Sequence, residues 1–377
     1  MIRLTHVIAG LERGGAQVFL YNLLSRLDRS AFACEVVSLT GHGAVGPRIR
    51  ALGVPVRELG MRPGSPNPVV LIKLRSWLRR NPPDVVQTWM YHSDLIGGLA
   101  ARWAGCDRVV WGVHFGSLDD SINWHTRFSA MACARLAGWL PRKIACPSEA
   151  SRRWHIEFGY PERKFALIPN GVDTDEFHPD REARASVRAE LGLPSDTALV
   201  GLMARFHPQK GHGAFVEAAA RVLASRPATD FLLCGGGIDW ENRTLRTWIE
   251  AAGLGNRFHL LGEREDMPRL MAALDVAALS SASEAGPMVV LEAMACGVPC
   301  ACTDVGDVVN MIGDTGRLAP PDNPEALGDA IVGLLSAGEE QRARMGSAAR
   351  RRIREKYPLS DVARRYEALY ADLVSRS

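Results

Sequence analysis

The sequence lacks the features that would place this chain among membrane-spanning, fibrous or disordered proteins. No apolar run approaches the ~18 residues that a membrane-spanning helix needs, and there is no fixed-period repeat and no low-complexity segment. Apolar residues make up 47% and charged residues 23% of the 377 residues, which is ordinary for a globular protein. The length suits two domains or one large α/β unit.

Patterns typical of a zinc site or a secretory signal are also missing. The eight cysteines are scattered, and the closest three, Cys296, Cys300 and Cys302, do not have the spacing of zinc ligands. We interpret them as small buried core residues in a reducing cytoplasm. The first ten residues have too short an apolar part for a signal peptide and predict a first strand instead.

Charge is low overall but unevenly distributed. The formal net charge is +3, with +10 in residues 1–172 and −7 in residues 173–377. The basic half could receive an anionic ligand or lie on an anionic membrane face. Its clearest local case is residues 71–80, where apolar side chains at helical spacing oppose cations. Two interpretations stay open: a surface helix with a solvated polar face, or a helix that contacts a membrane.

Short β-rich runs alternate with helical segments along both halves of the chain. We expect strands at residues 2–8, 34–39, 84–89, 108–113, 143–148 and 165–169, and again at 197–204, 230–237, 257–262, 276–280 and 299–304. This alternation predicts an α/β fold with parallel sheets and crossover helices. A turn-rich stretch interrupts it at 169–180. We therefore predict two tandem doubly wound domains facing a cleft, 1–172 and 173–356, and a final capped amphipathic helix within 357–377.

The stretch S-E-A-G-P-M-V-V-L-E-A-M-A-C-G-V-P, residues 283–299, raises the question of a buried carboxylate. Pro287 suits a first helical turn and Gly297 a helix end, so we expect a helix at about 287–296. Its N-terminus offers N–H groups to an anion, and Gly286 lets a ligand approach the backbone. Apart from Glu292 this helix is apolar, and a buried carboxylate needs hydrogen-bond donors.

A nucleotide-sugar would supply such donors. Glu292 lies five residues beyond Pro287, or roughly 7–8 Å along the helix axis, which is similar to the separation of a diphosphate from its ribose. The ribose diol could donate to Glu292, while Glu284, outside the helix start, could bind a second sugar. Alternatively, Glu292 lies on a half-exposed helix face and Glu284 only neighbours the helix cap.

Charged residues elsewhere near strand ends have two interpretations each. Arg205 and Lys210, in A-R-F-H-P-Q-K-G (204–211), could hold a diphosphate and stabilise it as it leaves, or could be solvent-exposed loop charges. Asp173 and Asp175 spell D-x-D, which can mark a metal–nucleotide site. Here they sit in the interdomain turn, and we interpret them as turn and cap chemistry, with no metal site.

Three residues of the first half could face the same ligand. Gly14 and Gly15 open a helix after the first strand, where their backbone could approach a phosphate or a sugar. Their spacing is not G-x-G-x-x-G, and Glu35 lies at the wrong end of its strand for a dinucleotide ribose, so an oxidoreductase is not expected. His114 ends a strand and could bond a donor sugar or an acceptor, although a structural role also fits.

In their order and spacing these motifs resemble those of the retaining GT-B glycosyltransferases of family four, a group often encoded with capsule and exopolysaccharide genes. The resemblance covers nearly the whole chain. It rests first on the E-x7-E pair Glu284 and Glu292, and then on I-P-N-G-V-D (168–173), A-R-F-H-P-Q-K-G (204–211), T-D-V-G-D (303–307) and G-D-T-G-R-L-A-P-P (313–321).

The resemblance implies a GT-B fold whose last helix crosses back to the N-terminal domain. The C-terminal domain would bind a UDP- or GDP-linked sugar, and the N-terminal domain the acceptor. Glu284, Arg205, Lys210 and His114 would act at the reacting end, with the two cations neutralising the departing diphosphate. The remaining donor-binding positions would be Gly14, Gly15, Gly286, Pro287, Met288, Val289 and Glu292. The family generally needs no metal, and no cofactor is implied.

Two points of specificity stay open. Ala285 replaces the glycine of the common E-G-F-G form, which leaves the donor sugar undetermined. Base selectivity would lie near 262–268, where Arg264 follows a strand end. We expect a metal-independent, retaining transfer to a saccharide acceptor, most simply a lipid-linked one, in cell-surface polysaccharide synthesis. The enzyme would be cytoplasmic, either free or peripheral on the inner membrane face, with no nucleic-acid partner. A nucleotide-sugar epimerase of the same fold and a non-catalytic binding subunit are the alternatives.

Overall fold

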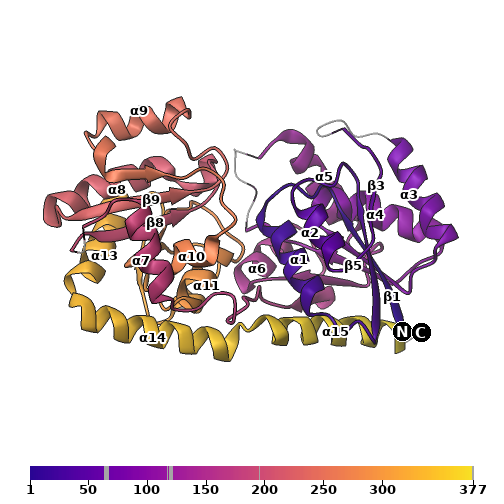
Figure 1. Cartoon of the computed structure of the whole chain (residues 1–377). Coiled ribbons are helices and arrows are strands. Elements are labelled where there is room, and N and C mark those ends of the chain that lie inside the picture. Colours follow the sequence, from indigo (N-terminus) through magenta and orange to yellow (C-terminus); the bar gives the residue numbers. More distant parts are fainter. Residues whose placement is uncertain (63–67, 117, 119–121, 195, 376–377) are drawn as a thin grey trace. The chain divides into compact units, whose positions relative to one another are not determined.

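The computed structural model describes residues 1–62, 68–116, 118, 122–194 and 196–375. The chain divides into two compact units (Figure 1). Unit 1 comprises Met1–Gly171 and Leu359–Ser377, and unit 2 comprises Val172–Pro358.

Unit 1 is built on a parallel sheet with strand order β3-β2-β1-β4-β5-β6-β7. The strands are β1 (Ile2–Ile8), β2 (Phe32–Ser38), β3 (Val56–Glu58), β4 (Val85–Trp89), β5 (Val109–Gly112), β6 (Lys143–Cys146) and β7 (Phe165–Leu167). The helices are α1 (Gly15–Arg26), α2 (Val45–Ala51), α3 (Pro68–Arg80), α4 (Tyr91–Ala104), α5 (Trp124–Leu136), α6 (Glu149–Glu157) and α15 (Leu359–Ser375). A short 3-10 helix, η1 (Glu162–Lys164), leads into β7.

Unit 2 repeats this plan with strand order β10-β9-β8-β11-β12-β13. Its strands are β8 (Ala198–Met203), β9 (Thr229–Cys234), β10 (Phe258–Leu260), β11 (Val276–Leu279), β12 (Cys300–Thr303) and β13 (Arg317–Ala319). Its helices are α7 (Arg181–Glu190), α8 (His212–Ser225), α9 (Arg243–Ala251), α10 (Met267–Ala272), α11 (Met288–Ala295), α12 (Val308–Ile312), α13 (Pro324–Ser336) and α14 (Gly338–Lys356), with 3-10 helices η2 (Pro208–Lys210) and η3 (Gly255–Arg257).

The strand order reverses at one point in each sheet. In unit 1 the reversal lies between β1 and β4, and in unit 2 between β8 and β11. Doubly wound sheets of this kind bind ligands beyond the carboxyl ends of the strands at that switch point. The predicted α/β fold with two tandem doubly wound units is confirmed. The loops after β1, β4, β8 and β11 are therefore the places where each unit would hold a ligand.

The last helix, α15, packs on unit 1 although the preceding helix α14 packs on α11 of unit 2. Its Tyr366 and Tyr370 are buried, and the ring of Tyr366 lies 6.1 Å from that of Trp89 in β4. Tyr370 Oη donates to Gln87 Oε1 at 3.3 Å. Burying two aromatic side chains is a strong reason for this helix to return, so the predicted return of the C-terminal helix is confirmed.

The basic stretch predicted as a helix at 71–80 is part of α3, and its apolar face packs inward. Leu74 and Leu78 are buried in the core of unit 1. Trp77 is half-buried: its Nε1 donates to Glu35 Oε1 at 3.3 Å, and the guanidinium of Arg57 lies 3.5 Å from its ring centroid. The core of unit 1 occupies this apolar face, and membrane contact by the rest of the helix stays a prediction. None of the helices described is long and apolar enough to cross a membrane.

Candidate functional site

Two loops of unit 2, one after β8 and one after β11, are joined at the switch point. Ser280 Oγ donates to the carbonyl oxygen of Lys210 at 2.7 Å, and the Ala282 N–H donates to that of Gln209 at 2.9 Å. Gly211 allows the approach, because at its φ of +65° a Cβ would lie 2.0 Å from the Ser280 carbonyl oxygen. The loop that carries the predicted cations and the loop that carries Glu284 are thus held as one surface.

Lys210 and Glu284 form an ion pair across these loops. Lys210 Nζ lies 2.5 Å from Glu284 Oε1, and Ser281 Oγ donates to the same oxygen at 2.7 Å. Only 24% and 11% of the two side chains are exposed, so the charges are partly desolvated and the pair is stronger than a surface salt bridge. A ligand at the switch point would meet an ammonium and a carboxylate side by side.

Arg205 lies on the same loop as Lys210, with its side chain exposed. The glycine run at 235–237 supports this loop from the neighbouring strand β9. A Cβ on Gly235 would lie 2.4 Å from the carbonyl oxygen of Ala204, and the Phe206 N–H donates to Gly236 O at 2.8 Å. The structure therefore brings both predicted cations to one loop, with Lys210 paired and Arg205 reaching solvent.

Glu292 is buried in α11, with 9% of its surface exposed. The alternative of a half-exposed position does not hold. Among the described residues no hydrogen-bond donor reaches its carboxylate. Burial, with a smaller contribution from the charge of Glu176, raises the pKa of Glu292 from 4.5 to about 7. A group that donates hydrogen bonds to this carboxylate would offset the desolvation.

The N-terminus of α11 has no side-chain cap. The helix begins at Met288, one residue later than predicted, and Pro287 is its N-cap in an extended conformation, with φ −70° and ψ 114°. Met288 and Val289 are partly exposed. The Val290 N–H donates to the Pro287 carbonyl oxygen at 3.3 Å. No side chain caps this end of the helix, and the N–H groups of a first turn can bind an anion there.

Sequence reasoning did not single out several residues that shape this surface. Ser280 holds the two loops together and Ser281 donates to Glu284. In the sequence, the sign of such a role was that both residues directly follow a strand. Gly306, in T-D-V-G-D, has a φ of +59°, and a Cβ there would lie 2.4 Å from the Glu284 carbonyl oxygen. The loop after β12 therefore packs directly on the loop that carries Glu284.

Arg264 is tied into an ion-pair network of its own. Its guanidinium contacts both carboxylate oxygens of Asp266 at 2.8 Å and Glu190 Oε1 at 2.9 Å. These carboxylates raise the pKa of Arg264, and the guanidinium in turn holds the pKa of Asp266 well below its usual range. The side chain links the loop after β10 to α7, and its charge is balanced by Asp266 of that loop and Glu190 of α7.

The D-x-D sequence makes a turn, as predicted. Asp173 Oδ1 accepts hydrogen bonds from the N–H groups of Asp175 at 3.0 Å and Glu176 at 3.4 Å. This is the pattern of an aspartate that caps its own turn. Within the described part of the chain no cluster of three or more His, Cys, Asp or Glu side chains could hold a metal ion.

Gly14, Gly15 and His114 lie in unit 1. Gly14 is the N-cap of α1, and a Cβ at Gly15 would meet nothing within 4 Å, so there is open space beside that backbone. His114 follows β5, and its ring stacks on Trp89 at 5.3 Å. Burial lowers the pKa of His114 to about 4, and its Nε2 is buried with no partner among the described residues. A neutral imidazole with a spare nitrogen could bond a hydroxyl.

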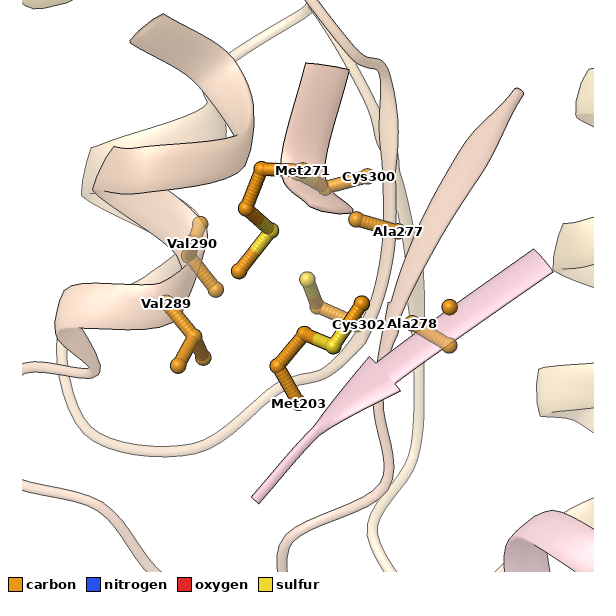
Figure 2. Close-up of a pocket in the computed structure, with 9 residues that line it drawn as sticks. Met203, Met271, Ala277, Ala278, Val289, Val290, Cys300 and Cys302 are labelled. Carbon is orange, nitrogen blue, oxygen red and sulfur yellow. The ribbon is translucent and has the colours of Figure 1, made fainter. Parts of the chain in front are cut away.

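A small cavity lies between α11 and the sheet of unit 2, and its lining sets it apart from the surface just described. Figure 2 shows Val289 and Val290 of α11 facing Met203, Met271 and Cys302 across it. Its volume is about 10 Å³, room for about one water molecule, and its lining side chains are aliphatic or contain sulfur. It is too small for a nucleotide-sugar, and we interpret it as a packing feature.

Comparison with known proteins identifies the family. The model described as "Glycosyl transferases group 1" matches residues 183–352, and "Glycosyltransferase Family 4" matches residues 13–176. A mannosyltransferase of Mycolicibacterium smegmatis, GDP-mannose-dependent and named for phosphatidylinositol monomannoside, is 30% identical over 302 residues, 76% of this chain and 75% of that protein. This chain belongs to the group 1 glycosyltransferases.

Other members of the family match nearly the whole chain. The putative glycosyltransferase EpsF of Bacillus subtilis is 27% identical over 367 residues, 90% of this chain and 89% of its own length. The crystal structure of Anabaena Alr3699/HepE in complex with UDP-glucose superposes with a TM-score of 0.85 at 22% identity and covers both chains fully. The fold of this group 1 glycosyltransferase is therefore GT-B, as predicted.

Proposed function

We propose that this glycosyltransferase moves a sugar, with retention and without a metal ion, from a UDP- or GDP-linked donor to a lipid-linked saccharide. The reaction would belong to cell-surface polysaccharide or glycolipid synthesis, on the cytoplasmic side. The observation that carries the proposal is Glu292, a buried carboxylate to which no described residue donates a hydrogen bond. It lies close in sequence to Glu284, whose ion-pair partner Lys210 is on the neighbouring loop at the switch point. The relative from Mycolicibacterium smegmatis is named for GDP-mannose and a phosphatidylinositol glycoside, and the Anabaena structure holds UDP-glucose.

In unit 2 each charged group would meet a different part of the donor. Glu292 accepts hydrogen bonds from the ribose diol, and the N-terminus of α11, from Gly286 to Val289, contacts the sugar or the phosphates. Arg205 and Lys210 neutralise the diphosphate as it leaves, while Glu284 orients the donor sugar. Charge stabilisation of a leaving diphosphate by two cations contributes directly to the rate.

In unit 1 the backbone at Gly14 and Gly15, with open space beside Gly15, would approach the phosphates. His114 Nε2, which has no partner among the described residues, would bond the donor sugar or the acceptor. The acceptor hydroxyl would attack from the face of the leaving group. A phosphate oxygen that departs on that face can take the hydroxyl proton, so catalysis consists of positioning and charge stabilisation. Arg264, with its guanidinium engaged, would influence base selection by ordering residues 262–268.

Two other functions use the same donor site. A nucleotide-sugar epimerase would change the free nucleotide-sugar with no acceptor present, and a binding subunit would change nothing. Analysis of products after incubation with donor alone, and then with donor and acceptor, separates the three. A new glycoside supports the proposal, whereas an altered free donor supports the epimerase.

The first experiment is calorimetric titration with UDP, GDP and ADP in EDTA. We expect one nucleotide to bind, and Glu292→Ala to lose the binding. Glu217→Ala, which removes an exposed glutamate of α8 in the same unit, is the matched control and should bind normally. Binding that needs a divalent ion, or that survives in Glu292→Ala, contradicts the assignment.

Measurements of turnover test the proposed roles of Arg205 and Lys210. Removing either Arg205 or Lys210 takes away a cation that faces the departing diphosphate, and loss of one such group typically lowers kcat by about 10²–10³. Arg205→Ala and Lys210→Ala should both show this loss while the nucleotide still binds. Wild-type turnover in both variants rules out a role for this loop in catalysis.

A further inference from the structure

The backbone at Met90, between β4 and α4, is strained. Its φ of 70° and ψ of 157° lie in a region that only glycine adopts readily. The residue follows the end of β4, where the strand order of the unit 1 sheet reverses and where a ligand is expected. Strained residues of this kind cluster at functional sites, so the conformation of this turn points to a role in the site.

Hydrogen bonds from three elements hold the turn in this conformation. The Met90 N–H donates to the carbonyl oxygen of Gly112 in β5 at 2.9 Å. The Met90 carbonyl oxygen accepts from the N–H groups of Ser93 at 3.0 Å and Asp94 at 2.9 Å. The carboxyl of Asp94, in the first turn of α4, accepts in turn from Thr88 Oγ1 of β4 at 2.5 Å. The turn is therefore fixed by β4, β5 and α4 together, which is what a strained residue needs in order to persist.

The turn directs the two aromatic residues that flank it toward different neighbours. Trp89 packs against Phe19 of α1, with the ring centroids 5.8 Å apart. Tyr91 instead lies against α6, where its Oη is 2.8 Å from Nε2 of His155. In a continuous strand, side chains two residues apart would lie on the same face of the sheet. The turn breaks that alternation.

As a result, two consecutive residues after β5 each stack on an aromatic ring. His114 stacks on Trp89 with 5.3 Å between the centroids and 29° between the ring planes. Phe115 stacks on Tyr91 at 5.0 Å and 12°. Gly112, which is opposite Trp89 in the strand register, allows the close approach, because a Cβ there would lie 3.3 Å from the Trp89 ring. The two stacked pairs hold the segment after β5 against the end of β4.

The Trp89 ring is itself fixed in place. Its Nε1 donates to Nδ1 of His6 in β1 at 3.3 Å, and both side chains are fully buried. The ring of Phe19 packs against both members of the stack, 5.8 Å from Trp89 and 5.6 Å from His114. A ring held by a buried hydrogen bond and by packing keeps one orientation and presents one face to the imidazole.

We propose that Trp89 is a positioning residue for His114. By stacking, Trp89 fixes the plane of the imidazole, so that Nε2, which has no partner among the described residues, meets a sugar or acceptor hydroxyl in one geometry. The turn at Met90 is what brings Trp89 against the imidazole. Catalysis by positioning is sensitive to small displacements, at about 10²-fold in rate for about 1 Å. The effect on turnover rests on the proposed function, whereas the orientation of the imidazole does not.

NMR of the full chain with isotope-labelled histidine tests the orientation of His114. The signal of His114 is identified by its loss in His114→Ala, and the ring current of Trp89 should displace it. Trp89→Leu should remove a large part of this displacement, and Trp89→Phe, which keeps a ring beside the imidazole, should retain some of it. Trp111→Leu, which removes another fully buried tryptophan of the same sheet, is the matched control and should leave the signal in place.

A double-mutant cycle tests the effect on the reaction. Turnover is measured as nucleoside diphosphate released from UDP-glucose or GDP-mannose with a saccharide acceptor. Trp89→Leu should lower kcat about 10–100-fold, with little change in KM for the donor. In His114→Ala the same substitution should lower kcat further by about twofold or less, because Trp89 acts through His114. A general loss of structure would lower kcat equally in both backgrounds, and Trp89→Phe should recover most of the turnover.

Three outcomes overturn the proposal: an unchanged His114 signal in Trp89→Leu, an equal effect of Trp89→Leu on kcat in both backgrounds, or wild-type turnover in His114→Ala. Circular dichroism checks that each variant is folded. If Trp89→Leu does not fold, Trp89→Phe carries both comparisons, with smaller expected effects.

The two measurements also separate this proposal from the proposed function. If the His114 signal moves as expected but the wild type turns over neither donor, the proposed function fails and the positioning of the imidazole by Trp89 stands. If the wild type turns over a donor and the signal does not move in Trp89→Leu, the proposed function stands and the role of Trp89 fails.

Discussion

Glu292 should make the stability of this protein fall as the pH rises. Its carboxyl has a pKa of about 7 when folded, against 4.5 for an unperturbed glutamate. At roughly 1.4 kcal/mol for each pKa unit, the difference corresponds to about 3 kcal/mol. Such a value is a substantial part of the stability of a typical domain, so it should be measurable.

The sign follows from which state binds the proton. Below the unfolded pKa both states are protonated and Glu292 contributes nothing. Between that value and the folded pKa of about 7 the unfolded chain has lost its proton while the folded chain keeps it, so stability declines with rising pH. Above the folded pKa the whole destabilisation of about 3 kcal/mol is present and no longer changes with pH.

Glu292→Gln removes the titration but keeps the shape of the side chain. Urea unfolding of wild type and variant from about pH 5 to about pH 8 should show the variant gaining stability relative to wild type by up to about 3 kcal/mol at the upper end. Glu217→Gln, on the exposed face of α8, should follow wild type throughout. If the free energy of unfolding changed with pH in the same way in wild type and Glu292→Gln, the conclusion that burial raises the pKa of Glu292 would be refuted.

Nucleotide binding should be coupled to the same proton. A ribose diol donates to the ionised carboxylate and stabilises it, so binding lowers the pKa of Glu292 and releases a proton near neutral pH. Affinity should rise between about pH 6 and about pH 8, and Glu292→Gln should bind about 10–100-fold more weakly, as expected for lost hydrogen bonds to a charged group. Calorimetry in buffers of different ionisation enthalpy measures the proton. Tight binding without proton release would show that the ribose is held elsewhere.

Three further predictions concern the same unit. Gly211→Ala should lower the free energy of unfolding by clearly more than the ~1–2 kcal/mol that a left-handed non-glycine residue costs, because its Cβ would meet the Ser280 carbonyl oxygen. Urea unfolding measures this loss. The control is Gly253→Ala, at a similar φ of +70° but with nothing within 4 Å of the added Cβ. Met271→Ala enlarges the cavity beneath α11 and should destabilise the protein by about 2–5 kcal/mol in the same assay; a loss below that range would mean that the site collapses. Glu284→Gln removes the ionic partner of Lys210 and should lower kcat more than nucleotide affinity, so an unchanged kcat would remove Glu284 from the reacting end.

Much of the fold and part of the site could be predicted from local signals. The alternation of strand and helix follows from hydrophobic periodicity, which each segment carries by itself. The burial of Glu292 was predictable because every neighbour in its short helix is apolar. The turn role of Asp173 was predictable because its hydrogen bonds reach only two and three residues ahead. These features depend on residues close in sequence.

Pairings between distant segments were not predictable. Arg264 contacts Glu190, 74 residues earlier, and that pairing depends on how α7 packs beside the loop after β10. The inward packing of α3 likewise depends on where the sheet lies, since an amphipathic helix with basic residues has the same sequence pattern on a protein core and on a membrane. The sequence pattern shows which face of a helix is apolar, but it does not show whether a protein core or a membrane covers that face.

The sequence by itself determined the α/β class and the motif of the two glutamates, because these rest on periodicity, turn residues and short spacings along one chain. The tertiary structure alone decided that Lys210 pairs with Glu284, that no described residue donates a hydrogen bond to Glu292, and that Trp124 and Phe128 are exposed. Strand order brings the loops after β8 and β11 together across more than seventy residues, and only that long-range packing sets which charges are paired and which surfaces remain open.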